Sequence, residues 1–197
     1  MTQVLTRRSV TIAVFVCAAT LATAADVRAQ GYIAPFIGFD FGGDSGCPEI
    51  TGCEDKKLNY GVAFGALNNV GGFEQEFAYA SDFFGEAPGL SSSVLTVMSN
   101  FMLAPNLQVA RPYFLVGVGL IKTDIELTPT SLLQSSNNHF GWDIGGGLMI
   151  FFGRHVAIRG DIRYFHSFQD LELGGVTVLD GTKLDFGRAA AGMVFKF

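Results

Sequence analysis

Residues 156–165 read Val-Ala-Ile-Arg-Gly-Asp-Ile-Arg-Tyr-Phe. Every second residue from Val156 is apolar, aromatic or glycine, and the alternate set contains two arginines and an aspartate. A period of two places these sets on opposite faces of a β-strand. An Arg facing lipid near the bilayer midplane costs about 2–4 kcal/mol. If this strand crosses a membrane, its charged face therefore points into the interior of a barrel.

Short amphipathic segments of this kind recur along the whole chain after the N-terminus. Each is about 9 to 15 residues long, and a tilted membrane strand needs about 9–11. None shows a sustained helical period. We therefore predict an all-β fold, an eight-stranded antiparallel up-and-down transmembrane β-barrel. Its expected strands cover residues 32–42, 58–67, 73–81, 94–103, 111–121, 139–151, 155–165 and 183–197.

The connections between these segments alternate between long and short. Bacterial outer-membrane barrels have long extracellular loops and short periplasmic turns, and an even number of strands leaves both termini in the periplasm. We therefore expect a bacterial outer-membrane protein with both termini in the periplasm. An external ligand would bind the long connections, which cover residues 43–57, 82–93, 122–138 and 166–182.

The first 29 residues have the pattern of an export signal. Arg7 and Arg8 precede an apolar stretch over residues 10–25 that is too short to span a membrane with its flanks. Val27-Arg28-Ala29 then offers a small-residue cleavage site before Gln30. A cut after Ala24 is the alternative. The expected organisation is a signal peptide over residues 1–29 and a barrel over residues 30–197.

The charge of the mature part excludes one class of partner. Residues 30–197 contain 10 basic and 17 acidic residues, a formal charge of −7. This acidic balance argues against binding nucleic acid, which needs a basic surface. No Gly-rich phosphate loop or metal-ligand cluster is present, so we expect neither a cofactor nor a metal.

Two cysteines, Cys47 and Cys53, lie in a polar, Gly-rich stretch of the mature part. A disulfide is the natural interpretation in an oxidising compartment. Two thiols with no histidine nearby are too few ligands for a metal site.

The charged residues on the inward faces suggest a network inside the barrel. An eight-stranded barrel has an interior just wide enough to be filled by side chains. Such charges would plug and stabilise the barrel, and the alternative is a narrow ion path or small-solute pore. The candidate residues are Glu74, Glu76, Asp143, Arg159, Asp161, Arg163 and Arg188.

Aromatic residues complete the membrane pattern. Trp142, Tyr60, Tyr79, Tyr113 and Tyr164 are of the kind that marks the interfaces of a membrane barrel.

The last strand carries a more specific pattern. Met193, Phe195 and Phe197 share one face, and Phe197 is the terminal residue. This end resembles the C-terminal signal by which outer-membrane barrels are recognised for assembly.

The mature chain resembles the porin-like outer-membrane β-barrel domain family, the small barrels of the OmpA/OmpX type. Members of this family include adhesins, complement-resistance factors and envelope anchors. The resemblance implies a structural or surface-interaction role, with outer-membrane lipid, lipopolysaccharide and the barrel assembly machinery as partners. The segments that carry it are Ala34-Pro35-Phe36-Ile37-Gly38, Pro112-Tyr113, Gly117-Val118-Gly119, Gly145-Gly146-Gly147, Arg159-Gly160-Asp161-Ile162-Arg163-Tyr164 and the Phe197 terminus.

One motif invites an enzymatic interpretation. His166-Ser167, with Asp161 or Asp170, resembles the residues of small barrels that deacylate lipid A. Those enzymes carry a His-x-Ser-Asn pattern, whereas His166 and Ser167 are adjacent and would point to opposite faces of a strand. Ser-dependent catalysis needs a base within hydrogen-bond reach of the hydroxyl. We therefore predict that the protein is not an enzyme.

Overall fold

The computed structural model describes residues 29–43, 56–81, 83, 90–107, 109–127, 133–170, 172–173, 176–177 and 183–197. No helix within these ranges is long and apolar enough to cross a membrane.

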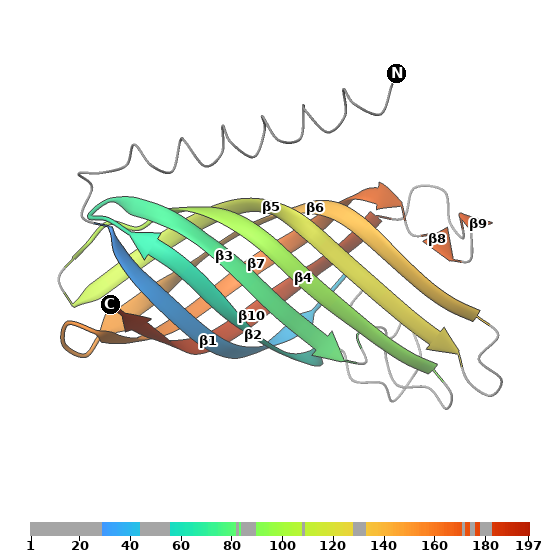
Figure 1. The fold of residues 1–197 in the computed structure, drawn as a ribbon, viewed down its shortest axis with the longest axis horizontal. Helices are drawn as coiled ribbons and strands as arrows, with labels where there is room; N and C mark the ends of the chain where they lie inside the picture. The colour runs from blue at the N-terminus through green and yellow to red at the C-terminus, as the bar shows by residue number, and fades with distance from the viewer. Residues whose placement is uncertain are drawn as a thin grey trace, which may run out of the picture.

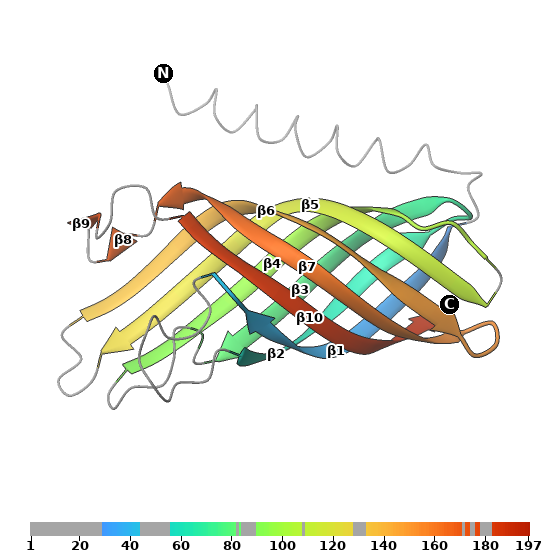
Figure 2. The ribbon, with the colours of Figure 1, turned by 180° about the vertical axis from the view of Figure 1, so that it is seen from behind.

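Within the described residues, eight long antiparallel strands close into a barrel in the order β1-β10-β7-β6-β5-β4-β3-β2 (Figures 1 and 2). Each strand pairs with its neighbour in the chain, and β1 closes the barrel against β10. This confirms the predicted barrel. The strands are β1 Gln30–Phe41, β2 Lys56–Leu67, β3 Gly71–Ser81, β4 Leu90–Leu103, β5 Ala110–Leu127, β6 Leu133–Phe151, β7 Val156–Asp170 and β10 Lys183–Lys196.

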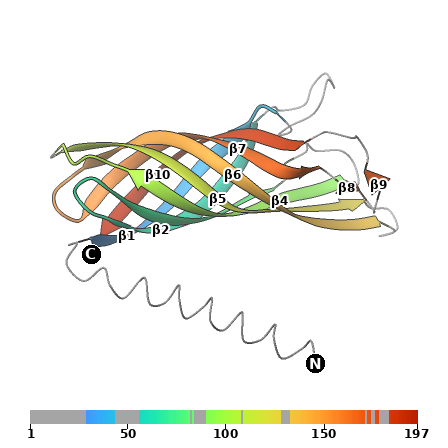
Figure 3. The same cartoon turned by 90° about the horizontal axis from the view of Figure 1, so that it is seen from above.

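Short connections gather at one end of the barrel, which we call the turn end. They cover residues 68–70, 104–109 and 152–155. The start of β1 and the C-terminus lie at the same end (Figure 3), where the N–H of Phe197 donates to the carbonyl of Gly31 at 2.9 Å. The opposite end is the loop end, where the connections between the long strands cover residues 42–55, 82–89, 128–132 and 171–182.

Local side-chain chemistry explains the tight turn between β2 and β3. Asn68 Oδ1 accepts hydrogen bonds from the backbone N–H groups of Val70 and Gly71, both at 2.9 Å. The N–H of Asn68 donates to the carbonyl of Gly71 at 2.8 Å. An Asn side chain that satisfies backbone donors two and three residues ahead is a common way to reverse a chain.

The structure corrects three of the expected connections at the loop end. The expected loop over residues 122–138 is largely strand, because β5 runs to Leu127 and pairs with β6 as far as Leu133. β4 begins at Leu90, inside the expected loop 82–93. β7 extends to Asp170, and a small hairpin follows from β8 Glu172–Leu173 and β9 Val176–Thr177. The residues added to these strands are largely polar, which is why the sequence suggested loops there.

The outer surface of the barrel is an apolar belt. Side chains on the alternate positions of every long strand are exposed and mostly aromatic or aliphatic. They include Ile37, Phe64, Phe77, Phe101, Val118, Leu148 and Ile162.

Two apolar clusters lie inside the barrel. The turn-end cluster comprises Tyr32, Ala34, Ala63, Leu67, Met102, Ala104, Tyr113, Leu115, Met149, Ala157 and Val194. The loop-end cluster comprises Ala80, Phe83, Val94, Met98, Ile121, Phe165, Leu184 and Phe186.

Candidate functional site

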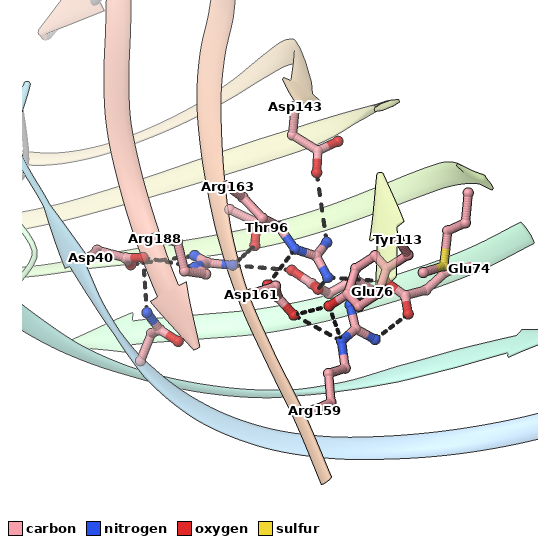
Figure 4. A network of polar contacts seen from close by, with 12 residues as sticks. Asp40, Glu74, Glu76, Thr96, Tyr113, Asp143, Arg159, Asp161, Arg163 and Arg188 are labelled. Atoms are coloured by element: carbon pink, nitrogen blue, oxygen red, sulfur yellow. Dashed lines mark hydrogen bonds and ion pairs between the residues drawn. The ribbon is translucent and has the colours of Figure 1, made fainter. Parts of the chain in front are cut away.

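A layer of charged side chains lies between the two apolar clusters. Along β7, for example, Ala157 belongs to the turn-end cluster and Phe165 to the loop-end cluster, with the charged residues between them. The structure brings all seven candidate interior residues into this layer, together with one further residue, Asp40 (Figure 4). We call these eight residues the charge layer: Asp40, Glu74, Glu76, Asp143, Arg159, Asp161, Arg163 and Arg188.

Glu74 forms the centre of the half nearer the turn end. Its carboxylate accepts from both terminal nitrogens of Arg159 and from Arg163 Nη2 at 3.0 Å. The hydroxyl of Tyr32 donates to Glu74 Oε2 at 2.5 Å. The carboxylate is fully buried, so four donors replace the water that it loses, as a buried charge requires.

A second carboxylate, Asp161, holds the two β7 arginines in position. Its Oδ2 accepts from Arg159 Nε at 2.8 Å, and its Oδ1 accepts from Arg163 Nε at 2.9 Å. Tyr113 donates its hydroxyl to Asp161 at 2.6 Å and accepts from Arg159 Nε at 2.7 Å. The guanidinium of Arg159 also lies over the Tyr113 ring, 5.0 Å from its centroid.

Arg163 links the two halves of the charge layer. Besides Glu74 and Asp161, it contacts Glu76 Oε2 at 2.7 Å and Asp143 Oδ2 at 3.6 Å. One guanidinium group therefore contacts four carboxylates from three strands. Removing it would leave Asp143 without a cation, and Glu74, Glu76 and Asp161 would each keep one arginine of two.

Arg188 organises the half nearer the loop end. Its Nε donates to Asp40 Oδ1 at 2.7 Å, and its Nη1 reaches Glu76 at 3.2 Å and Thr96 Oγ1 at 3.1 Å. Its guanidinium lies 4.7 Å from the ring centroid of Phe165, an aromatic of the loop-end cluster. The delocalised cation therefore contacts apolar faces on one side and carboxylates on another.

Neutral polar residues complete the hydrogen bonds. Asn59 Nδ2 donates to Asp40 Oδ1 at 2.9 Å. With its amide nitrogen turned toward Asp143, Asn100 donates to Asp143 Oδ1 at 2.8 Å and accepts from Arg163 Nη1 at 3.1 Å.

A glycine makes room for this packing. A Cβ on Gly147 would lie 2.6 Å from the Tyr113 hydroxyl and 2.6 Å from Asp161 Cβ. The missing side chain at Gly147 of β6 therefore lets Tyr113 of β5 and Asp161 of β7 meet inside the barrel.

Sequence reasoning overlooked Asp40 and the neutral polar residues Tyr32, Asn59, Thr96 and Asn100, and it misplaced Tyr113. Asp40 lies on the same face of β1 as Tyr32 and is fully buried. Tyr113 was expected at a membrane interface, and the structure corrects this: it is 5% exposed and points into the barrel. Its parity could have indicated this, because it lies on the opposite face of β5 from the apolar residues Phe114, Val116 and Val118. Aromatic identity alone does not distinguish an interface tyrosine from a buried one.

The charge layer contains more carboxyl groups than guanidinium groups. Among the described residues it contains five carboxylates and three guanidinium groups, each less than a tenth exposed. Each guanidinium contacts at least two carboxylates, and every contact is direct. The arrangement can tie strands together across the interior. The described residues contain no group of three or more His, Cys, Asp or Glu placed to hold a metal ion.

The C-terminal residues form an outward stripe at the turn end. Met193, Phe195 and Phe197 are 47%, 39% and 81% exposed. Recognition of this stripe by the assembly machinery remains a prediction. Cys47 and Cys53 lie outside the described residues, and their pairing also remains a prediction.

The His-Ser motif lies within β7. Ser167 is fully buried, whereas His166 is partly exposed on the outer face, where its Nδ1 is 2.8 Å from Asp185 Oδ1. Trp142 and Tyr164 surround the imidazole, with ring centroids 5.5 and 6.4 Å away. The two residues therefore point away from each other.

Comparison with known proteins supports the architecture. Residues 9–197 match the family model described as "Outer membrane protein beta-barrel domain". No curated protein matches the chain.

Solved structures share the fold at low identity. Neisserial surface protein A is 15% identical, with a TM-score of 0.63 over 85% of this chain and 97% of that one. Ail of Yersinia pestis, in complex with the heparin analogue sucrose octasulfate, is 15% identical, with a TM-score of 0.57 over 86% of this chain and 99% of that one. A major outer membrane protein from Thermus thermophilus is 14% identical, with a TM-score of 0.50 over 86% of this chain and 99% of that one.

Proposed function

Because this chain belongs to the outer membrane protein beta-barrel family, we propose that it works at the cell surface through its loop end, while its charged interior acts as a plug. The protein has a structural or surface-interaction role and no catalytic one. The observation that carries this proposal is the charge layer, whose buried guanidinium groups join opposite walls of the barrel. An interior occupied by direct ion pairs leaves the external connections as the surface for partners.

The composition of the connections limits the partner. Ail binds a sulfated sugar analogue in the complex named above. In this chain, residues 43–57, 82–93, 122–138 and 166–182 contain eleven acidic residues and three lysines. An acidic surface repels polyanions, so the loop end takes a cationic or uncharged partner. The Cys47–Cys53 disulfide would stiffen the first of these connections.

The proposal includes export and a defined orientation. Residues 1–29 act as a signal peptide and residues 30–197 form the mature barrel, whose first strand begins at Gln30. Both termini lie in the periplasm, the assembly machinery reads the C-terminal stripe, and lipid and lipopolysaccharide surround the belt.

Two lysines test the orientation. Lys56 is exposed at the loop end, whereas Lys196 lies at the turn end. A membrane-impermeant amine reagent added to intact cells should label Lys56 and leave Lys196 unlabelled until the cells are lysed. Labelling of Lys196 but not Lys56 in intact cells would reverse the proposed orientation.

Conductance tests the plug. Protein recovered from outer membranes and inserted into planar bilayers should give no discrete channel events. Heat-dependent migration on a detergent gel confirms that the same sample is folded. Conductance is also measured for two variants. Arg163→Ala changes the charge layer, and the control Arg154→Ala removes an exposed charge from the β6–β7 turn.

A narrow pore is the second candidate function. The excess of carboxylates over guanidinium groups in the charge layer favours it, and such a pore would prefer cations. Reproducible conductance in the wild type that changes in Arg163→Ala, and not in Arg154→Ala, would replace the plug with this pore.

A further inference from the structure

A polar pair interrupts the apolar belt between β3 and β4. Gln75 and Ser99 are partners in the register of these strands, and Ser99 Oγ donates to Gln75 Oε1 at 2.6 Å. Both side chains are partly exposed on the outer face, on the opposite side of the sheet from Glu74 and Glu76. The two strands run side by side across the near wall of the barrel in Figure 1.

Apolar side chains surround this pair on every side. Gln75 has a phenylalanine two residues before it and two after it on β3, and Phe64 faces it from β2. Ser99 lies between two apolar residues on β4 and faces Val118 of β5. The pair therefore lies within the belt and not at its edge. The surrounding ring, which we call the apolar ring, comprises Phe64, Phe73, Phe77, Val97, Phe101 and Val118.

The hydrogen bond between the two residues leaves much of the amide unsatisfied. A glutamine side chain has two N–H donors and two acceptor sites on its oxygen. Ser99 occupies one acceptor site, and within the described part of the chain the Nε2 amino group of Gln75 has no acceptor. Hydrocarbon chains offer no hydrogen-bonding group, so an exposed amide carries a large free-energy penalty there. A partner with both donors and acceptors at this depth would remove the penalty.

We propose that this face of β3 and β4 binds a second copy of the chain across a two-fold axis centred on Gln75. A carboxamide is its own complement, because each Nε2 can donate to the Oε1 of the other copy. A two-fold interface brings the same residue of both copies together. The apolar ring of each barrel then packs around the paired amides and excludes lipid, as the rim of an interface does around its centre.

Other occupants fit the chemistry less well. Acyl chains of lipid or lipopolysaccharide have no polar atoms at the depth of the belt, and their headgroups lie at its edges. An unrelated membrane protein would have to present a matching amide at the same height. A second copy of the chain, inserted in the same orientation, presents Gln75 at the same depth in the membrane.

Association in detergent provides the first test. Protein recovered from outer membranes is placed in density-matched neutral micelles, and its mass is measured by sedimentation equilibrium. The wild type should show a monomer–dimer equilibrium, and Gln75→Leu should raise the dimer dissociation constant by about tenfold or more. Gln75→Met is a second variant that removes the amide and keeps the length. Both place an apolar group against lipid and should fold.

The matched control lies on the opposite side of the barrel. Ile162 projects outward from β7, four strands away from β3 in the closed order, and is 63% exposed. Ile162→Ala should leave the dissociation constant unchanged. A monomeric wild type, or equal association of wild type and both Gln75 variants, would overturn the proposal.

Cross-linking in the native membrane identifies the occupant. A photoreactive benzoylphenylalanine in place of Phe101 should give an adduct of twice the chain mass. The adduct should be lost when Gln75→Leu is added. Adducts only with lipid, or only with a different protein, contradict the proposal.

Discussion

Arg188 and Asp40 lie 148 residues apart in the chain, yet they are direct partners across the seam where β10 meets β1. Two hydrogen bonds join them, Nε to Oδ1 at 2.7 Å and Nη2 to Oδ2 at 3.3 Å. Both side chains are fully buried. The last strand is thus tied to the first by a charge pair inside the barrel.

Breaking this pair should destabilise the barrel. Arg188→Ala leaves Asp40 buried without its cation, which typically costs about 3–5 kcal/mol. Urea unfolding of the barrel in lipid vesicles should show a lower midpoint. The double variant Arg188→Met with Asp40→Leu should recover much of the loss, because no unpaired charge remains. If the double variant lost as much stability as the two single variants added together, the charged groups themselves would be needed to hold β10 against β1.

Arg163 should matter more than any exposed ion pair. Arg163→Ala leaves Asp143 of β6 without a cation and removes one of two cations from the carboxylates on β3 and β7, so we expect a loss of about 3 kcal/mol or more. The control is Lys122→Ala, since Lys122 pairs with Asp124 at 2.9 Å but both side chains are about two-fifths exposed. Exposed pairs contribute only about 0–1 kcal/mol. Equal urea midpoints for Arg163→Ala and the wild type would contradict a structural role for the charge layer.

Two glycines on adjacent strands, Gly147 and Gly160, should respond differently to an added methyl group. Gly147→Ala puts a methyl group against Tyr113 and Asp161, and overpacking of this kind costs about 1–3 kcal/mol. Gly160→Ala on the adjacent strand is the control, because a Cβ there would meet only the Ala190 carbonyl oxygen at 3.9 Å. Unfolding midpoints should fall for Gly147→Ala and stay level for Gly160→Ala. A similar change in the unfolding midpoint at both positions would mean that the strand propensity of alanine, and not crowding, causes the change.

Phe197 should affect assembly more than stability. Its ring is 81% exposed, and its backbone N–H, which any residue other than proline provides, makes the bond to Gly31. Phe197→Ala should therefore lower the amount of folded barrel in the outer membrane, measured by heat-dependent migration of membrane fractions. The same variant refolded from urea should lose less than about 0.5 kcal/mol, as exposed substitutions usually do. A large loss on refolding with normal membrane levels would assign the residue a packing role.

Much of the fold could be predicted because each strand carries its own signal. Alternation in residues 156–165 separates Arg159 and Arg163 from Ile158 and Ile162, and the structure keeps this separation. The strand ends were less well predicted at the loop end. Lys122 and Asn138 looked like loop residues because they are polar, yet they pair across β5 and β6. The polarity of a residue indicates that it does not need to face lipid, and it says little about where a strand ends.

The interior site also contains some residues that the sequence identified and others that it did not. Its arginines and most of its carboxylates could be chosen from their place on an inward face. Tyr113 could not be separated from interface tyrosines by residue type, and Asp40 was overlooked because a single acid near a strand end resembles the start of a loop.

By itself, the sequence determined which face of a strand such as β7 meets lipid, because each arginine exposed to hydrocarbon near the midplane costs about 2–4 kcal/mol. Only the tertiary structure decided which charges meet. Closure of the barrel brings Arg188 to Asp40, and the height of each strand in the wall brings Arg163 to Glu74 and Glu76. Those contacts depend on register and curvature summed around eight strands, which no local pattern contains.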